Sequence, residues 1–281
     1  MKALKEKRQL YYQYRMDLQS SAQVQKYLKK KGLVILPVGC LEMHGPEIPL
    51  GCDAFHAWAQ AILLAEVWQA LVLPPVYFTF PGASGPWPGT VDISLSASEE
   101  YLTEIVLSLI KGNFKQIVLC GTHGPLNIML SNVIRTVFQQ TRVIVGHLQP
   151  DLMPKEQMLK ELGYPRGEDI LVLASLKILG WGGVYHPGVK EEKPMEFPFS
   201  TIGELKKQNI SLPWTFSRDY QHTGLRPQVK AEHVDRAIQI MKKAARKYKE
   251  FPTVFKKYQK EIKELFIKQP WRKENIWTLT K

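Results

Sequence analysis

The sequence predicts an α/β fold, with a three-layer α/β/α domain built on a mainly parallel central sheet. Short apolar runs recur along the chain, and longer segments with helical periodicity separate them. This alternation is typical of parallel strands joined by right-handed crossovers. The sequence contains no internal repeat and no low-complexity tract. The 281 residues are therefore expected to form a single domain, with a basic helical segment from about residue 230 to 281.

The expected strands are short and largely apolar. Leu33–Gly39 and Gln116–Gly121 have the composition of strands that are buried on both faces, and Arg142–Leu148 is a third expected strand. Leu71–Phe80 is also expected to be extended, but two consecutive prolines limit its pairing.

Helical patterns lie between and after these strands. We expect helices at residues 54–69, 98–111, 126–140, 155–162 and 170–179, and two more at 230–249 and 253–268. The stretch Trp181–Pro213 is rich in glycine and proline and is expected to form an irregular lid.

Composition narrows the class of protein. Hydrophobic residues make up 44% and charged residues 23% of the chain, which is typical of a globular protein. The apolar runs are much shorter than the roughly 18 residues of a membrane span, and the first residues lack the apolar stretch of a secretory signal. The three cysteines form no CxxC pair. These features predict a cytoplasmic protein.

The net charge of +12 is concentrated near the C-terminus. Residues 230–281 contain fifteen basic and six acidic residues. Such a segment can bind nucleic acid or another anionic partner. Its apolar residues recur at three- and four-residue steps, however, which indicates amphipathic helices with the lysines on a solvated face. Nucleic-acid binding is therefore the less favoured interpretation.

Polar side chains follow two of the expected strands. Glu42, His44, Glu47 and Asp53 come after the first strand, and His123 follows Gln116–Gly121. Ligands of an open parallel sheet bind outside the carboxyl ends of its strands, so these side chains are expected to share one crevice. Carboxylate and imidazole groups together suit Zn²⁺, Mn²⁺ or Fe²⁺. Individually, each residue could instead be a helix cap, a turn residue or a hydrogen-bonded histidine.

Three segments resemble the creatininase (creatinine amidohydrolase) family of metal-dependent hydrolases. Leu36–Asp53 (LPVGCLEMHGPEIPLGCD) is similar to the opening metal motif of the family. Pro86–Ser96 (PWPGTVDISLS) resembles its PGT segment, and Ile117–Asn127 (IVLCGTHGPLN) its asparagine-glycine-histidine motif. A weaker similarity lies at Thr223–Ala245. The resemblance implies a creatininase-like α/β fold.

The sequence departs from the family pattern at several positions. Glu47 replaces the usual second histidine of the opening motif, and Gly121 replaces the asparagine of the third motif. Pro125 occupies the place of a ligating glutamate, two residues after the motif histidine. The His-Ala-Gly-Glu turn of the family has its best counterpart at Pro165–Glu168, which lacks the histidine.

The resemblance implies a centre of two divalent metal ions, Zn, Mn or Fe. Asp53 would bridge them, Glu42 and His123 would complete one site, and His44 and Glu168 the other. Glu168 could instead be a carboxylate that favours the start of a helix. A metal-bound hydroxide would then attack the carbonyl of a small polar cyclic substrate or amide.

The proton carrier of this reaction is open between His186, Glu47 and His222. Cys40, Cys52 and Cys120 are expected to pack near the metal turns. The resemblance also allows hydrolytic C–C ring opening of an oxidised inositol-type cyclic ketone, action on formamides or small peptides, or a metal-binding protein that has lost catalysis. The resemblance also implies a homo-oligomer, often a hexamer in this family.

Overall fold

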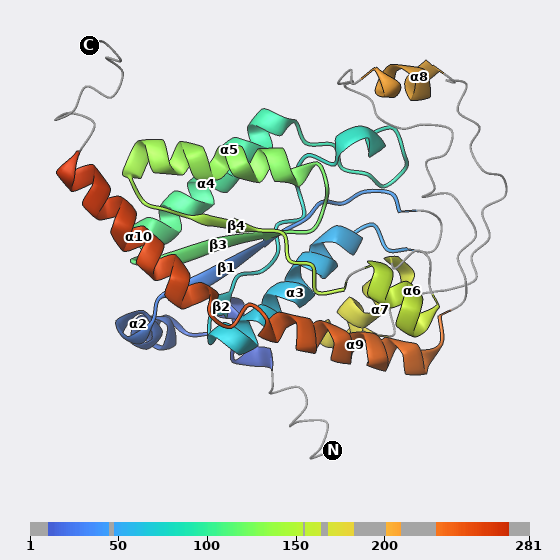
Figure 1. The fold of residues 1–281 in the computed structure, drawn as a ribbon, viewed down its shortest axis with the longest axis horizontal. Coiled ribbons are helices and arrows are strands. Elements are labelled where there is room, and N and C mark those ends of the chain that lie inside the picture. Colours follow the sequence, from blue (N-terminus) through green and yellow to red (C-terminus); the bar gives the residue numbers. More distant parts are fainter. Residues whose placement is uncertain are drawn as a thin grey trace, which may run out of the picture.

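The computed structural model describes residues 11–44, 48–153, 155–163, 168–182, 201–208 and 229–269, which Figure 1 draws as coloured ribbon. Four strands form one sheet in the order β2-β1-β3-β4, and every pairing is parallel. The strands are β1 (Leu33–Val38), β2 (Leu71–Val72), β3 (Gln116–Gly121) and β4 (Gly146–Leu148). The expected mainly parallel sheet is thus confirmed.

The helices alternate with these strands along the chain. Their bounds are α2 (Ser21–Lys30), α3 (Cys52–Trp68), α4 (Leu95–Lys111), α5 (Leu126–Thr141), α6 (Lys155–Leu162), α7 (Glu168–Leu179), α8 (Thr201–Lys207), α9 (Ala231–Arg246) and α10 (Phe251–Lys268). Two short 3-10 turns, Met16–Leu18 and Gly82–Ser84, lie among them. No helix of the described ranges is both long and apolar enough to cross a membrane.

Helices cover both faces of the sheet. On one face, Leu33 and Ile35 of β1 pack in a core with residues of α3, α7 and α9. On the other face, Val34 and Leu36 pack in a second core with residues of α4 and α5. Alternate residues of a strand point to opposite faces, so a strand buried on both sides is apolar throughout. These layers, visible in Figure 1, confirm the three-layer α/β/α architecture.

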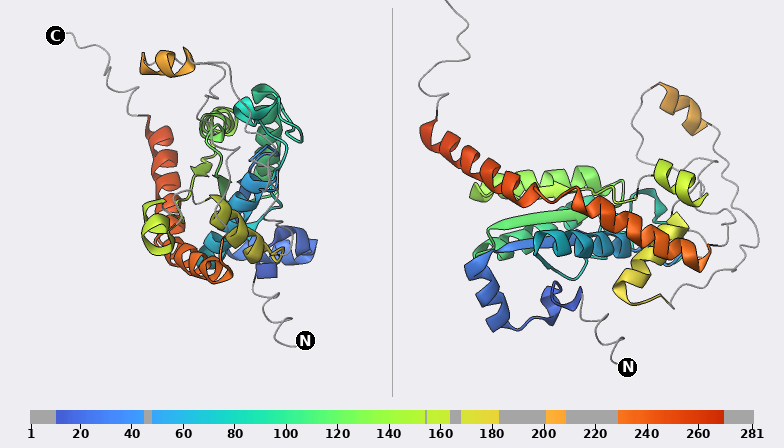
Figure 2. Two further views of the ribbon diagram at one scale, coloured as in Figure 1. Left: turned by 90° about the vertical axis from the view of Figure 1, so that its right-hand side faces the viewer. Right: turned by 60° about the horizontal axis from the view of Figure 1, so that its bottom comes forward.

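The basic C-terminal segment forms two amphipathic helices. In α9 the buried residues recur at helical steps, at Val234, Ala237, Ile240, Met241, Ala244 and Ala245. Helix α10 continues along the same side of the molecule (Figure 2), and Gln259 donates hydrogen bonds to the carbonyl oxygens of Lys115 and Ile144. Lys257 and Lys260 lie 3.7 Å from Glu261 and Glu264, one helical turn further on. Such exposed pairs are typical of a solvated face.

Some elements differ from the sequence-based expectation. Strand β2 ends before the two prolines and has only two residues, and β4 has three of the seven expected. Helix α2 was not expected, although Ser20 and Gln23 form a capping box that marks its start. Helix α8 lies inside the stretch expected to be irregular. The arrangement of residues 1–281 as a single domain stays a prediction.

The end of β1 is packed tightly against the start of α3. A Cβ atom added to Gly39 would lie 2.3 Å from the backbone nitrogen of Ala54, closer than real Cβ contacts. Gly39 is also held in place, because its N–H donates to the carbonyl of Val76 and its own carbonyl accepts from Thr79 Oγ1. The absence of a side chain at position 39 therefore allows α3 to start directly beside the end of β1.

We expect Gly39→Ala to lower the free energy of unfolding by about 1–3 kcal/mol, because an added methyl group must push two backbone segments apart. Gly124→Ala is the matched control, since a Cβ atom there meets nothing within 4 Å. Its effect should stay within about 0.5 kcal/mol. Equilibrium urea denaturation of both variants measures the difference. Equal stabilities would contradict the tight contact between β1 and α3.

Candidate metal centre

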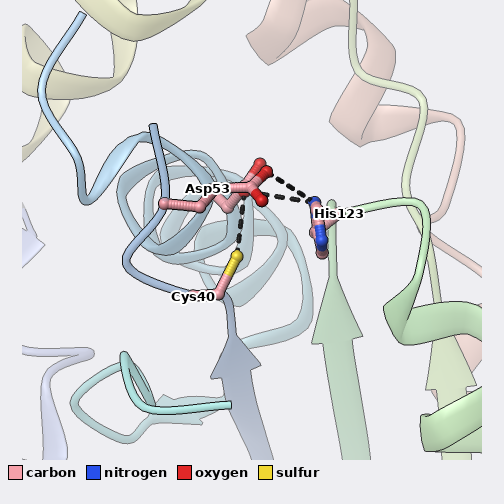
Figure 3. A group of neighbouring side chains, drawn as sticks. Cys40, Asp53 and His123 are labelled. Carbon is pink, nitrogen blue, oxygen red and sulfur yellow. Dashed lines mark hydrogen bonds and ion pairs between the residues drawn. The ribbon is translucent and has the colours of Figure 1, made fainter. Parts of the chain in front are cut away.

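A cluster of buried polar side chains lies where β1 and β3 end and α3 begins. Cys40, Glu42 and His44 follow β1, Asp53 lies in the first turn of α3, and His123 follows β3. Figure 3 shows Cys40, Asp53 and His123 pointing toward one another beyond the two strand ends. The parallel strands place their carboxyl ends at the same edge, as expected for a ligand site of an open α/β sheet.

Asp53 occupies the centre of this cluster. Its Oδ2 atom lies 3.2 Å from His123 Nδ1, 3.5 Å from His44 Nε2 and 3.2 Å from Cys40 Sγ, whose S–H donates to it. The first turn of a helix favours a carboxylate electrostatically. Thr122 Oγ1 donates to the backbone carbonyl of Asp53 at 3.0 Å, which ties the first turn of α3 to the end of β3.

Glu42 is the second carboxylate of the cluster and is 2% exposed. Its Oε1 atom lies 3.2 Å from His123 Nδ1 and 3.6 Å from His44 Nε2. Its other oxygen, Oε2, accepts a hydrogen bond from Ser84 Oγ at 2.6 Å. The buried hydroxyl of Ser84 therefore fixes the rotation of the carboxylate, so that Oε1 faces the two imidazole rings.

The ring orientation of the histidines is also set by their neighbours. His44 Nδ1 lies 3.1 Å from the backbone carbonyl of Glu42, and a carbonyl can only accept, so Nδ1 carries the hydrogen. This contact directs Nε2 of His44 toward the carboxylates. His123 directs Nδ1 toward them, while its buried Nε2 has no hydrogen-bond partner among the residues that the structure describes.

Burial and neighbouring charges shift the pKa values of these groups. Burial raises the pKa of Glu42 to about 7, against the opposing effect of His123. For His44, burial favours the neutral ring, but the carboxylates of Asp53 and Glu42 outweigh it and raise the pKa to about 9. Burial also disfavours ionised Asp53, but His44 and His123 outweigh it and hold the pKa of Asp53 well below its usual range.

These pKa shifts show that the buried carboxylates require compensating positive charge. Without a cation, protons on the imidazole rings compensate the buried carboxylates, since the charges of Asp53 and Glu42 also raise the pKa of His123 against the effect of burial. A divalent cation in the same place would supply that charge and leave the imidazole nitrogens as neutral ligands. The cluster is therefore electrostatically suited to a metal ion.

The spacing of the donor atoms tests this fit geometrically. One donor atom each from Cys40, Glu42, Asp53 and His123 can be chosen so that all four lie within 4.8 Å of one another. Donor atoms bound to one tetrahedral ion at bond lengths of about 2.0–2.3 Å lie about 3.3–3.8 Å apart. The contacts of 3.2 Å that His123 makes with both carboxylates are close to this separation. These residues therefore fit a divalent metal ion.

The structure brings together four of the residues expected at the site, namely Glu42, His44, Asp53 and His123. Glu168 begins α7, as expected, but its side chain is outside the described residues. Glu47, His186 and His222 also lie outside the described residues. The contacts of Cys40, Ser84 and Thr122 with the two carboxylate residues are not among the features predicted from the sequence.

Fold and site together define an α/β protein with a buried cluster of carboxylate and imidazole groups at the carboxyl edge of a parallel sheet. Residues 17–171, more than half of the chain, match the family described as creatinine amidohydrolase. The chain belongs to this creatininase family, a family of metal-dependent hydrolases, which confirms the resemblance found in the sequence.

Two relatives show the range of proteins in which similar sequence occurs. The 3-dehydro-scyllo-inosose hydrolase of Thermotoga maritima is 31% identical over 103 residues, which cover 36% of this chain and 33% of that protein. The mycofactocin precursor peptide peptidase of Mycolicibacterium smegmatis is 37% identical over 98 residues, or 33% of this chain and 39% of that protein. The chain thus matches well under half of the length of either relative.

The similarity of fold extends further than the similarity of sequence. A crystal structure of creatinine amidohydrolase (creatininase) superimposes with a TM-score of 0.62 at 18% identity, covering 84% of this chain and 96% of that chain. At this identity the likeness establishes the fold, and the expected creatininase-like fold is confirmed.

We expect Ser84→Ala to weaken binding of Zn²⁺ about 10- to 100-fold, the usual cost of losing a group that orients a metal ligand. The loss of its hydrogen bond frees the carboxylate of Glu42 to rotate. Ser175→Ala is the matched control, because Ser175 is equally buried and its hydroxyl has no hydrogen-bond partner in the described part of the chain. Competition titration with a chelating dye measures both affinities. Equal affinities would show that Ser84 does not position Glu42.

Proposed function

We propose that the protein is a hydrolase that uses bound divalent metal to cleave a small polar cyclic substrate or amide at a carbonyl carbon. The observation that carries this proposal is the convergence of two buried carboxylates and two imidazoles at one edge of the sheet. A structural role alone does not require such a set, since burying four ionisable groups without a ligand is costly. Membership of the creatininase family supports the same activity.

The residues of the cluster divide into two overlapping sets. Glu42, Asp53 and His123 would hold one ion, because His123 Nδ1 lies 3.2 Å from an oxygen of each carboxylate. His44 Nε2 lies 3.5 Å from the same oxygen of Asp53, and we propose that it would hold a second ion with Asp53. Asp53 is common to both sets. When bound, divalent cations lower the pKa of coordinated water and polarise a substrate carbonyl.

Glu168 is the residue that we propose to complete the second set. It begins α7, the helix whose Val172 and Leu176 pack with Cys52 in one apolar cluster. Cys52 directly precedes Asp53 at the start of α3. Position 168 lies one helical turn before Val172 in α7, and the packing of Val172 against Cys52 supports this proposal. The family resemblance implies a ligating glutamate at position 125, where this chain has Pro125, and this supports a ligand from another element.

The chain must also move a proton to the leaving group. We propose His186 or Glu47 for this role, and both lie outside the described residues. Glu47 belongs to the segment between His44 and Ile48, which connects two buried residues beside the cluster. Its place in the sequence, three residues after His44, supports Glu47, and the histidine chemistry of proton transfer near neutral pH supports His186.

The bond that is cleaved and the substrate are part of the proposal. The relatives are named as an inosose hydrolase and a peptide peptidase, so similar sequence accompanies different substrates. We favour a cyclic amide or related amide, and the similarity to the inosose hydrolase supports hydrolytic ring opening of an inositol-type cyclic ketone as the second candidate. Release of product from creatinine, formamides and inososes by the metal-loaded protein would distinguish them. Activity on none of these classes would favour a metal-binding protein without catalysis.

A small-molecule substrate is the main partner that we propose, with homo-oligomerisation, for example as a hexamer, as the family resemblance implies. Nucleic acid is not proposed, because the basic segment forms amphipathic helices and two lysines of α10, Lys257 and Lys260, form exposed pairs with glutamates of the same helix. A cytoplasmic location and the identity of the metal, zinc, manganese or iron, also remain proposals.

We expect Asp53→Asn to abolish binding of both ions and to lower kcat/KM at least about 100-fold, because several kcal/mol of electrostatic stabilisation depend on the metal. The change keeps the size of the side chain but removes the charge shared by His44 and His123. Elemental analysis of the purified protein measures the metal content, and circular dichroism checks the fold.

Asp235→Asn is the matched control for this change. Asp235 forms an exposed ion pair with Lys177, with 64% of its side chain accessible, and such pairs contribute little. Its metal content and turnover should equal those of the wild type. Retention of two ions by Asp53→Asn would rule out Asp53 as the bridging ligand.

A further inference from the structure

Cys40 lies inside the cluster of metal-binding side chains. It is fully buried, immediately follows Gly39 at the end of β1, and its Sγ atom is 3.2 Å from Asp53 Oδ2. Its sulfur belongs to the one group of described residues in which four potential ligand atoms lie within 4.8 Å of one another. Figure 3 shows the sulfur and the imidazole of His123 on different sides of the Asp53 carboxylate.

This position is specific to Cys40 among the three cysteines of the chain. Cys120 Sγ faces the carbonyl oxygen of Ala57 at 3.8 Å, and Cys52 Sγ lies 3.4 Å from His56 Nε2. Neither belongs to the group of four. All three cysteines are buried, as expected for cysteines that pack in a core. Among the described residues, Cys40 is the cysteine whose sulfur also contacts Asp53 and belongs to the group of potential metal ligands.

The contact distance is compatible with a shared ion. Sulfur and oxygen atoms bound to one tetrahedral zinc ion lie about 3.5 Å apart, since Zn–S and Zn–O bonds are about 2.3 and 2.0 Å long. The observed 3.2 Å contact needs to open by a few tenths of an ångström. In exchange, the thiol gives its proton to the solvent, and its hydrogen bond to Asp53 is replaced by a bond from sulfur to metal.

We propose that Cys40 is a thiolate ligand of the metal ion held by Glu42, Asp53 and His123, and that it makes this site selective for Zn²⁺ over Mn²⁺. This inference rests on the metal centre proposed above. Carboxylate ligands suit Mn²⁺, whereas a thiolate favours zinc and is unusual around manganese. A set of three anionic ligands and one imidazole would give this site a full tetrahedral set of protein ligands. Water and substrate would then bind at the second ion, the one that we propose to be held by His44.

X-ray absorption at the zinc edge tests the sulfur ligand without any assay of activity. The protein loaded with one equivalent of Zn²⁺ should show a sulfur scatterer at about 2.3 Å in addition to nitrogen and oxygen at about 2.0–2.2 Å. The sulfur signal should vanish in Cys40→Ser and persist in Cys120→Ser, the same substitution in a buried cysteine whose Sγ faces the carbonyl oxygen of Ala57. If the Cys40 variant does not fold, the presence or absence of a sulfur scatterer in the wild-type protein still tests whether a thiolate binds the zinc ion.

Competition between Zn²⁺ and Mn²⁺ gives a second readout. The ratio of the two affinities should fall at least tenfold in Cys40→Ser, since even losing a group that only orients a ligand costs about 10- to 100-fold. Cys120→Ser should keep the wild-type ratio.

Each other outcome contradicts the proposal in a distinct way. Bound zinc with only nitrogen and oxygen ligands would overturn the role of Cys40 and leave the proposed metal centre intact. A sulfur signal that persists in Cys40→Ser would assign the thiolate to another cysteine. Failure of the wild-type protein to bind Zn²⁺ or Mn²⁺ would overturn both the ligand and the proposed function.

Discussion

The close packing of the first turn of α3 against the end of β1 is the constraint on which the site depends. Because Gly39 has no side chain, the backbone of α3 can lie directly against the end of β1. Asp53, in the first turn of α3, therefore lies beside the ends of β1 and β3. Its carboxylate then lies within 3.5 Å of two imidazole nitrogens, from His44 and His123. The negative charge of Asp53 is compensated by protons on these rings or by a cation, and either arrangement holds the ends of β1, β3 and α3 together.

The sheet could be predicted well at its centre and less well at its edges. Strand β3 has the predicted bounds and β1 ends one residue early, because strands buried on both faces are continuous apolar runs. The edge strands β2 and β4 are shorter than predicted. An edge strand extends only as far as its neighbour pairs with it, and this length depends on contacts that its own sequence does not encode. Helix α2, which was not predicted, does have a local sequence signal, the capping box formed by Ser20 and Gln23.

The site was predictable where ligands follow strands directly. Glu42, His44, Asp53 and His123 could be placed at one edge because parallel strands end together, and the family resemblance added the bridging role of Asp53. The contact between Ser84 and Glu42 joins residues 42 positions apart, with α3 and β2 between them in the sequence, so no local pattern encodes it. Cys40 was interpreted as packing because a cysteine after an apolar strand has the same appearance in sequence whether or not it faces a carboxylate.

The central claim is that this buried cluster is the metal centre of the protein, and anomalous diffraction from crystals of the zinc-loaded protein tests it most directly. Data collected on both sides of the zinc absorption edge locate the ion without assumptions about its ligands. The account predicts a strong peak enclosed by Glu42, Asp53 and His123, and a second peak beside His44 at full loading. Zinc found only at side chains outside the cluster, such as the half-buried His233, with the cluster around Asp53 unchanged, would contradict it.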